Sequence, residues 1–541
     1  MRSVVVSVLV GLMTCVAVAG DERPIDYRFS FSQAAQHRMN VEVTFTDLPD
    51  GPLQLRISRS SPGRYALHDF ASAIDDVMVT TMDGTPLAVA QGQSNEWTVA
   101  EPSHNVRVRY TVSANTIDGT YAAIDDTHAH LNMPAVILWA PGLEHRPARV
   151  ALVARQEGAP PWQAGTQLFP TDDPLVFTAP NFQYLMDSPI EFGRIVWRTF
   201  EAPVPSGAAT PAPTIRIALH HLGTDTEADA FASGTRQIVE EARQVFGEFP
   251  PYEGNTYTVL ADYLPSARND GMEHRNSTVL TSERTLATAP VKLLDAVAHE
   301  FFHGWNVERI RPRSLEPFDF ARVNVSGELW FAEGVTSYYD GLLMARAGLW
   351  TLDDLLDDLG AAVSKVVTSP AVRVRSAEDM SRLAPAVDSS GDSAGAATAT
   401  NYISYYTFGA ALGLGFDFAI RERTGGAASL DDVMRVLWRD FGRPGGREIG
   451  SVDRPYTAAD IQRAIAQVTG DKALAAALMA RYVEGHEVMD YHRLLERAGL
   501  IVRERTVNVE SPPQPLEIVA FETAGRTPSE AQLAFRQRWL R

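Results

Sequence analysis

The stretch that decides the fold is His299-Glu300-Phe301-Phe302-His303, set in an apolar pattern that predicts one helix over residues 288–311. Histidines four residues apart lie about 40° apart around a helix axis and about 6 Å apart along it. Two imidazoles in that relation can bind one zinc ion at about 2.0–2.1 Å. Glu300 is turned about 100° from His299, which suits a general base better than a metal ligand.

The rest of this segment fits a buried amphipathic helix. Thr288 is predicted to cap it, and Pro290 is tolerated in a first turn. The residues expected to face the core recur at helical spacing: Val291, Leu294, Ala298, Phe301, Phe302 and Trp305. The competing interpretation is a solvated helix that carries two unrelated histidines. The amphipathic setting favours the zinc site.

A zinc site of this kind needs a third ligand and an open position. Glu333, in Trp330-Phe331-Ala332-Glu333-Gly334, is the best candidate. Two neutral histidines and one carboxylate leave the site a net charge of about +1, so the metal can lower the pKa of its bound water to about 7. Glu300 would accept a proton as that water attacks a carbonyl carbon, and would pass it to the leaving amine.

The N-terminus has the pattern of a secretory signal peptide. Arg2 precedes an apolar run over residues 4–18, which ends at Ala17-Val18-Ala19-Gly20 before a polar segment. The run is shorter than the roughly 20 residues of a membrane-spanning helix, so we expect cleavage, export to the periplasm or beyond the cell, and no membrane association afterwards. Cleavage would remove Cys15, the only cysteine, and with it any cysteine-based catalysis.

Composition and patterning outline the remaining chain. The net charge of −19 argues against nucleic acid as the partner, because nucleic acids are bound by basic patches. Alternating apolar residues over about 27–200 predict antiparallel strands and a β-sandwich. Residues 203–213 contain four prolines and predict a linker, and strand and helix patterns follow it. Residues 381–400 predict a mobile loop, and Thr351 with Asp354 and Ser429 with Asp432 predict helix starts.

Several motifs in matching order resemble the glycyl aminopeptidase family of gluzincins. They are Ser61-Pro62-Gly63-Arg64-Tyr65, the zinc motif extended to Asn306, Arg309-Ile310-Arg311-Pro312, residues 329–339 and Ser429-Leu430-Asp431-Asp432-Val433-Met434-Arg435. The resemblance runs from about residue 25 to residue 500. It implies zinc held by His299, His303 and Glu333, with Glu300 as base. Many members carry a PDZ-like domain after the helical region, and we expect none here.

The expected fold class is therefore α+β and multidomain. The predicted parts are a signal peptide (1–20), an N-terminal antiparallel β-sandwich (21–202), a linker (203–213), a thermolysin-like α/β zinc domain (214–350), a helical catalytic subdomain (351–500) and a C-terminal tail (501–541).

The resemblance also implies two residues that act on substrate. Gly271-Met272-Glu273-His274 is similar to the segment with which related aminopeptidases hold a free N-terminus, so Glu273 would pair with the substrate ammonium. Tyr406 matches the tyrosine that donates its hydroxyl to the tetrahedral oxyanion, with Tyr405 as its rival. A surface glutamate and a core aromatic are the plain alternatives. Asp295, Asn306, Ser337 and Asp340 are weaker candidates for orienting the ligands.

The leading hypothesis is a zinc aminopeptidase that removes small N-terminal residues, Gly or Ala, from peptides. An endopeptidase or another amide hydrolase could use the same zinc. A third hypothesis is an exported, non-catalytic binding protein with structural zinc. Glu300 argues against it, because a structural site needs no base.

Overall fold

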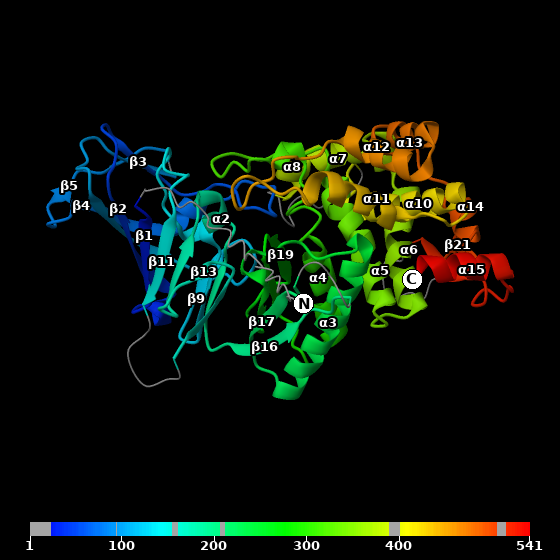
Figure 1. Ribbon diagram of the computed structural model, residues 1–541, viewed down its shortest axis with the longest axis horizontal. Helices are drawn as coiled ribbons and strands as arrows, with labels where there is room; N and C mark the ends of the chain where they lie inside the picture. The colour runs from blue at the N-terminus through cyan, green and yellow to red at the C-terminus, as the bar shows by residue number, and fades with distance from the viewer. Residues whose placement is uncertain (1–22, 94, 154–160, 206–210, 389–400, 506–514) are drawn as a thin grey trace, which may run out of the picture.

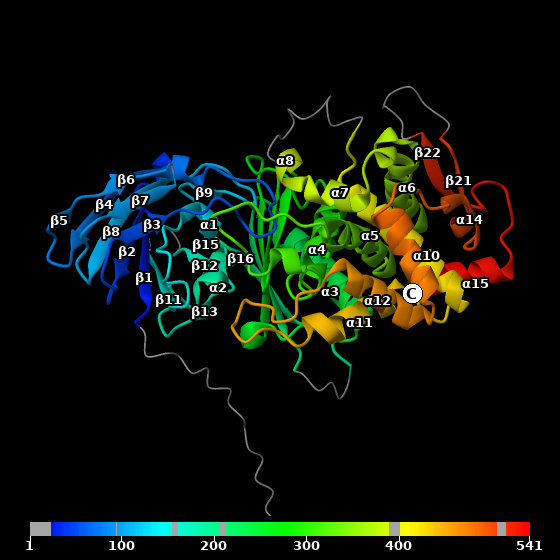
Figure 2. The ribbon, with the colours of Figure 1, turned by 90° about the horizontal axis from the view of Figure 1, so that it is seen from above.

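The computed structural model describes residues 23–93, 95–153, 161–205, 211–388, 401–505 and 515–541. The predicted signal peptide, residues 206–210 of the predicted linker and residues 389–400 of the predicted loop lie outside the described residues. Along the long axis, sheets of the N-terminal part lie at one end, helices of the C-terminal half lie at the other, and the sheet that contains β16–β20 lies between them (Figures 1 and 2).

Three sheets form the N-terminal unit, and the alternating pattern predicts their strands but not the number of sheets. In β2 every second residue is buried, so one face of the strand meets the core. The largest sheet has the order β13(Phe169–Pro170), β14(Val176–Ala179), β11(Ala148–Val153), β1(Ile25–Ser30), β2(Arg38–Phe45), β8(Val106–Ser113), β4(Ile74–Thr81), β5(Pro86–Leu87). The two smaller sheets have the orders β3(Leu53–Arg56), β7(Glu96–Val99), β6(Ala90–Gln91) and β12(Gln163–Thr166), β15(Ile190–Gly193), β10(His128–Leu131), β9(Ala122–Ile124).

One pairing in this unit departs from the antiparallel prediction. β1 and β11 run parallel, with Ile25 opposite Ala148 and Ser30 opposite Val153. More than a hundred residues separate these strands in sequence, so no hairpin fixes their relative direction. Short helices complete the unit: η1(Ala34–Gln36), η2(Phe70–Ala73), α1(Met133–Val136) and α2(Phe182–Met186).

The central sheet has the order β16(Val196–Glu201), β17(Thr214–His221), β18(Thr256–Tyr263), β20(Ser277–Ser282), β19(Asp270–His274). β17, β18 and β20 are parallel, and β16 and β19 pair antiparallel at the two edges. β16 precedes the predicted boundary at residue 202, so the second unit starts earlier than expected. Its pairing partner β17 follows the proline-rich segment, and a pattern within one segment does not reveal such a partner.

Two helices on this sheet pack closely. α3(Asp225–Phe246) begins with a capping box between Thr224 and Glu227 and ends at Gly247, whose φ of 88° suits glycine. α4(Pro290–Phe302) approaches it so closely that a Cβ at Gly234 would lie 2.4 Å from Leu294 Cδ1. η3(Glu253–Asn255) precedes β18, and η4(Arg313–Leu315), η5(Trp330–Gly334) and α5(Val335–Arg346) follow α4.

The predicted helix over 288–311 is shorter in the structure. Ala289 is the N-cap and has no side-chain capping bond, while Thr288 bonds to Thr285 instead. After His303 the chain turns, with i to i+5 bonds such as Ile310 N–H to the Trp305 carbonyl at 2.7 Å. The prediction that Val291 faces the core is wrong. Its side chain is 43% exposed, because the first turn of the helix lies at the surface.

The C-terminal half is helical, and the capping boxes predicted at Thr351 and Ser429 are confirmed. Its elements are α6(Leu352–Thr368), η6(Pro370–Arg373), α7(Ala377–Arg382), α8(Ala384–Asp388), α10(Tyr405–Thr424), α11(Leu430–Leu437), η8(Trp438–Gly442), α12(Ala458–Thr469), α13(Lys472–Leu478), η9(Met479–Val483), α14(Tyr491–Glu496), β21(Leu500–Glu504), β22(Leu516–Ala520) and α15(Glu530–Trp539).

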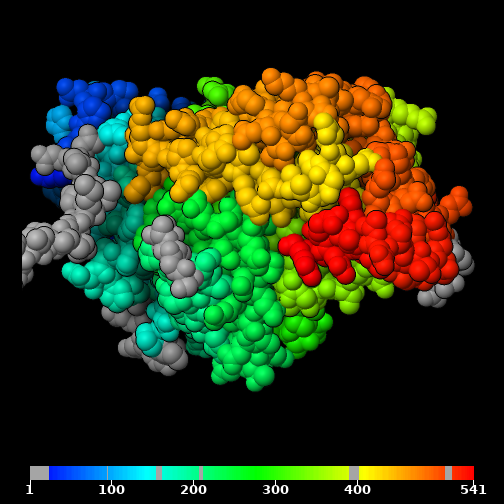
Figure 3. All heavy atoms as spheres, turned by 45° about the vertical axis from the view of Figure 1, so that its right-hand side comes forward, coloured from blue at the N-terminus to red at the C-terminus, as the bar shows by residue number. Residues whose placement is uncertain are grey.

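The last residues are structured where we expected an extended tail. β21 pairs with β22, and α15 buries Trp539 against α10. Figure 3 shows this segment, in red, lying against the yellow and green helices. The Trp539 indole N–H also donates to the Tyr338 hydroxyl of α5 at 2.9 Å, so the segment packs as part of the helical half.

Two large hydrophobic cores organise the described residues. One lies in the N-terminal unit, with Phe320 inserted from the second unit, and the other extends from Ala202 to Trp539. The predicted zinc domain and helical subdomain therefore share one continuous core. Among the described residues, no helix combines the length and apolar character needed to cross a membrane.

Candidate active site

The predicted metal ligands converge. His299 lies in the last turn of α4, and His303 caps that helix with helical backbone angles, so the i, i+4 relation survives although the helix ends there. Glu333 Oε2 lies 3.2 Å from His303 Nε2 and 3.7 Å from His299 Nε2. One ligand atom from each of the three residues lies within 4.8 Å of the others.

Glu333 reaches this position from η5, a single turn of π-helix that continues into α5. At this turn the backbone of η5 packs directly against the backbone of α10, with no side chain between them. A Cβ on Gly409 would lie 1.9 Å from the Trp330 carbonyl oxygen, and one on Gly334 would lie 2.4 Å from the Tyr405 carbonyl oxygen. Glycine at both positions is therefore a packing requirement, and the contact fixes the turn that carries Glu333.

Hydrogen bonds hold the two imidazoles. His299 Nδ1 donates to Asp340 Oδ2 at 2.9 Å, and His303 Nδ1 donates to the Asn306 carbonyl at 2.5 Å. Because both Nδ1 atoms donate, both Nε2 atoms carry lone pairs toward Glu333 when the rings are neutral. Of the four weaker candidates, Asp340 and Asn306 therefore do contact the ligands.

The structure also reveals a contact from the N-terminal unit. The Tyr65 hydroxyl donates to Glu333 Oε1, and burial followed by Glu333 itself raises the pKa of Tyr65 well above its usual value. Glu333 is buried, which opposes ionisation, but His303 and His299 hold its pKa well below the usual range. Tyr65 stands in a motif that resembles the family, although the sequence assigned it no role.

Two further carboxylates lie beside the ligands. Glu300, Glu273 and His303 also have ligand atoms within 4.8 Å of one another. Burial raises the pKa of Glu300 to about 7, opposed by His299 and His303 and reinforced by Glu273. Burial likewise raises the pKa of Glu273 to about 7. A Cβ on Gly271 would lie 2.3 Å from Glu300 Oε1, so β19 packs directly against this carboxylate.

Glu273 lies at the junction of the two units. A Cβ on Gly63 would lie 2.6 Å from Glu273 Oε2, and Gly63 has a φ of 74°. Arg64 forms an ion pair with Asp270, at the start of the strand that carries Glu273. A cleft opens here, lined by residues of both units that include Gly63, Tyr65, Glu273 and Leu315.

The two tyrosines of α10 have different surroundings. The Tyr405 hydroxyl donates to Asp388 Oδ2 at 3.0 Å. The ring of Tyr406 lies 5.9 Å from that of His299, and within the described residues its hydroxyl has no hydrogen-bond partner. Among the described residues, Tyr406 and not its rival thus combines a place beside His299 with a hydroxyl that has no partner.

Two family models match the chain. The one described as the Peptidase M61 N-terminal domain matches residues 26–194, and the one described as M61 glycyl aminopeptidase matches residues 292–412. Together they span just over half of the sequence. The chain belongs to the M61 glycyl aminopeptidase family. The second match contains every predicted site residue except Glu273.

Three solved structures are similar to this chain to different degrees. An aminopeptidase N family protein from Idiomarina loihiensis has a TM-score of 0.75 and 25% identity, over 89% of this chain and 79% of that one. A variant of an M1 zinc metallopeptidase from Deinococcus radiodurans has a TM-score of 0.48 and 14% identity, over 86% and 94%. Legionella pneumophila aminopeptidase A in complex with aspartic acid has a TM-score of 0.49 and 14% identity, over 84% of this chain and 48% of that one. No curated protein sequence matches significantly.

The family match and the similarity to the Idiomarina protein show that this M61 member is a metallopeptidase. That result replaces the hypothesis of a non-catalytic binding protein. It also confirms the α+β multidomain fold class, with β-sheets in the N-terminal part and helices in the C-terminal part.

Proposed function

We propose that this enzyme is a zinc aminopeptidase that removes small N-terminal residues, Gly or Ala, from peptides. The observation that carries the proposal is the convergence of His299, His303 and Glu333 beside two buried carboxylates of raised pKa. The preference for Gly or Ala rests on the family description alone.

The donor set fits zinc. Two imidazole nitrogens and one carboxylate oxygen are a ligand set that catalytic zinc uses, and it leaves a position open. The Nδ1 bonds to Asp340 and to the Asn306 carbonyl orient both imidazoles as ligands. Zinc bound there supplies a Lewis acid that polarises a carbonyl and activates water.

Glu300 is the proposed general base. Its carboxylate is buried, and a pKa near 7 lets it take a proton at neutral pH and return it in the next step. The proton would come from the attacking water and go to the amine that leaves. Gly271 packs against this carboxylate and limits its movement.

Glu273 and Tyr406 would handle the two ends of the scissile residue. A substrate ammonium would pair with Glu273, which would ionise as the cation binds. The Tyr406 hydroxyl would donate to the oxyanion of the tetrahedral intermediate. Burial, followed by Glu333, raises the pKa of Tyr406 well above its usual value, so the hydroxyl keeps the proton it donates.

A Glu300→Gln variant tests the chemistry. We expect zinc binding to be retained, and hydrolysis of glycyl and alanyl amides to fall by at least about a hundredfold, the scale of general base catalysis. Glu240→Gln, on the exposed face of α3, is the matched control. Full activity in Glu300→Gln would overturn the mechanism.

A Glu273→Gln variant separates the aminopeptidase from an endopeptidase with the same zinc. An aminopeptidase should lose activity only toward substrates with a free N-terminus. Equal loss toward N-blocked peptides would favour the endopeptidase. We further propose export by cleavage after residue 19 or 20, which N-terminal sequencing of the natural protein would test.

A further inference from the structure

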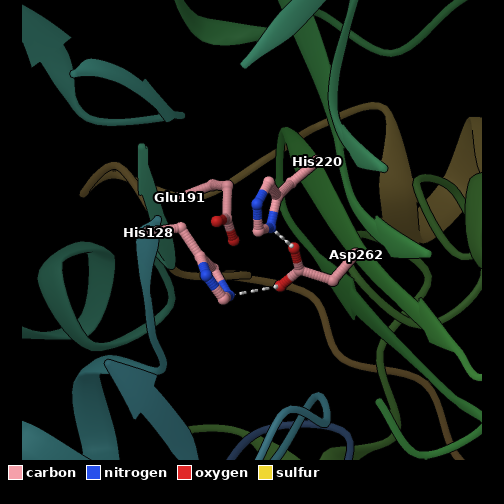
Figure 4. Close-up of side chains that lie close together, drawn as sticks. All are labelled: His128, Glu191, His220 and Asp262. Atoms are coloured by element: carbon pink, nitrogen blue, oxygen red, sulfur yellow. Dashed lines mark hydrogen bonds and ion pairs between the residues drawn. The ribbon is translucent and has the colours of Figure 1, made fainter. Parts of the chain in front are cut away.

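A second cluster of potential metal ligands lies away from the active-site residues. His128 on β10, Glu191 on β15, His220 on β17 and Asp262 on β18 each offer one ligand atom, and these four atoms lie within 4.8 Å of one another. Figure 4 shows the four side chains pointing toward one another from two sheets. All four are buried, the most exposed being His220 at 8%.

Strand register creates this cluster. His220 and Asp262 are direct partners in the parallel pair β17 and β18. His128 lies opposite Gly193, where a Cβ would come within 2.5 Å of the His128 Cβ. Close packing between the sheets completes the arrangement, since a Cβ on Gly165 of β12 would lie 2.9 Å from Leu260 Cδ2 of β18.

Three buried atoms in the cluster lack a hydrogen-bond partner among the described residues: His128 Nε2, Glu191 Oε1 and Asp262 Oδ2. Because His128 Nδ1 lies 3.2 Å from Asp125 Oδ1 and donates to it, Nε2 of a neutral ring carries a lone pair. That nitrogen lies 3.6 Å from Asp262 Oδ2. Without a metal, only a proton on His128 Nε2 would separate it from Asp262 Oδ2. A metal cation would satisfy all three buried atoms directly.

His130 lies beside this set, with Nδ1 3.7 Å from Asp262 Oδ2, but stays outside it. Its Nδ1 lies 3.1 Å from Glu191 Oε2 and its Nε2 lies 2.8 Å from the Asp118 carbonyl. Both partners are acceptors, so both ring nitrogens donate and neither has a lone pair for a metal. His130 therefore orients Glu191 through Oε2, while Oε1 of that carboxylate has no hydrogen-bond partner among the described residues.

We propose that His128, Glu191, His220 and Asp262 form a second metal site, which holds a structural zinc ion. Two imidazoles and two carboxylates are ligands that zinc accepts in four-coordinate sites. The spacing resembles that of the active-site set: His220 Nδ1 lies 2.9 Å from Asp262 Oδ1, as His303 Nε2 lies 3.2 Å from Glu333 Oε2.

The site would be closed. Four protein ligands fill a tetrahedral shell, and their burial leaves no path for a substrate, which is typical of structural zinc. Two ligands come from the N-terminal unit and two from the central sheet, so the ion would crosslink the units. The active-site wall formed by Gly63 and Tyr65 would then keep its place relative to Glu273 and Glu333.

Metal analysis of the full chain tests this proposal. After saturation with zinc and desalting, the wild-type protein should hold two ions per chain. Glu333→Gln should retain one ion. The double variant His128→Gln, His220→Gln should lose the second ion. His104→Gln, the matched control at a histidine that bonds to the Leu48 carbonyl outside both clusters, should keep both.

The possible outcomes separate the two proposed sites. Two outcomes overturn the second site. One is a folded Glu333→Gln protein without any ion, and the other is a His128→Gln, His220→Gln protein that holds two. In either case protons on the histidines would balance the carboxylates. One ion in the wild type that survives in Glu333→Gln supports the second site and contradicts the proposed catalytic zinc. If the double variant fails to fold, two measurements on Glu333→Gln still test the second site. They are its ion count and the absorption spectrum of its cobalt-loaded form.

Discussion

A Tyr65→Phe substitution tests how the N-terminal unit contributes to the metal centre. The change deletes the hydroxyl that donates to Glu333 Oε1 and leaves the buried ring in place. A hydrogen bond to a charged partner contributes about 1.5–3 kcal/mol. Loss of a partner that orients a metal ligand lowers metal affinity by about 10- to 100-fold, which corresponds to a similar range of free energy. We therefore expect a 10- to 100-fold weaker zinc affinity at the active site.

The assay is recovery of activity when metal-free enzyme is titrated with buffered zinc, because activity reports the active-site ion alone. Tyr110→Phe is the matched control. That hydroxyl is also buried but bonds to the Val136 carbonyl and the Leu138 N–H, within the N-terminal core. It should lower stability without changing zinc affinity. A Tyr65→Phe enzyme whose zinc affinity is within about twofold of the wild type would refute a role of this hydroxyl in binding.

Two other predictions concern packing and pH. Gly409→Ala places a methyl group 1.9 Å from the Trp330 carbonyl oxygen, so the free energy of unfolding should fall by about 3 kcal/mol and activity with it; an unchanged urea midpoint would contradict the close crossing. Burial and Arg64 lower the pKa of His68 to about 4. The unfolded state then binds more protons, and stability falls as pH drops from about 6.5 toward 4. His68→Gln should remove about 2 kcal/mol of the stability difference between pH 7 and pH 5, measured by urea unfolding, and an unaltered difference would exclude this histidine as its source.

The sequence was most informative where chemistry depends on local spacing. The histidine motif places its residues through helix geometry alone, and the capping boxes at Thr351 and Ser429 depend on contacts three residues apart. Glu333 was chosen as the third ligand from its residue type and position, and the family resemblance implied the same role. The π-helical turn that positions it was not foreseen. Such a turn depends on the approach of α10, and the local sequence pattern contains no information about that contact.

What the sequence did not reveal involves distant partners. Tyr65 reaches Glu333 across 268 positions, and β16 was assigned to the wrong unit because its partner follows the linker. The cluster around Asp262 joins four strands, so no local sequence pattern pointed to it. Val291 shows the converse error, since a residue at the correct helical spacing is exposed when its turn lies at the surface.

The backbone contact between η5 and α10 has a consequence for motion. Gly334 and Gly409 lie so close that neither element can shift along the other without a steric clash. Glu333 and Tyr406, which extend from these elements, must therefore travel as one rigid piece. A substitution that forces these two backbones apart should therefore displace the metal ligand and the hydroxyl donor together.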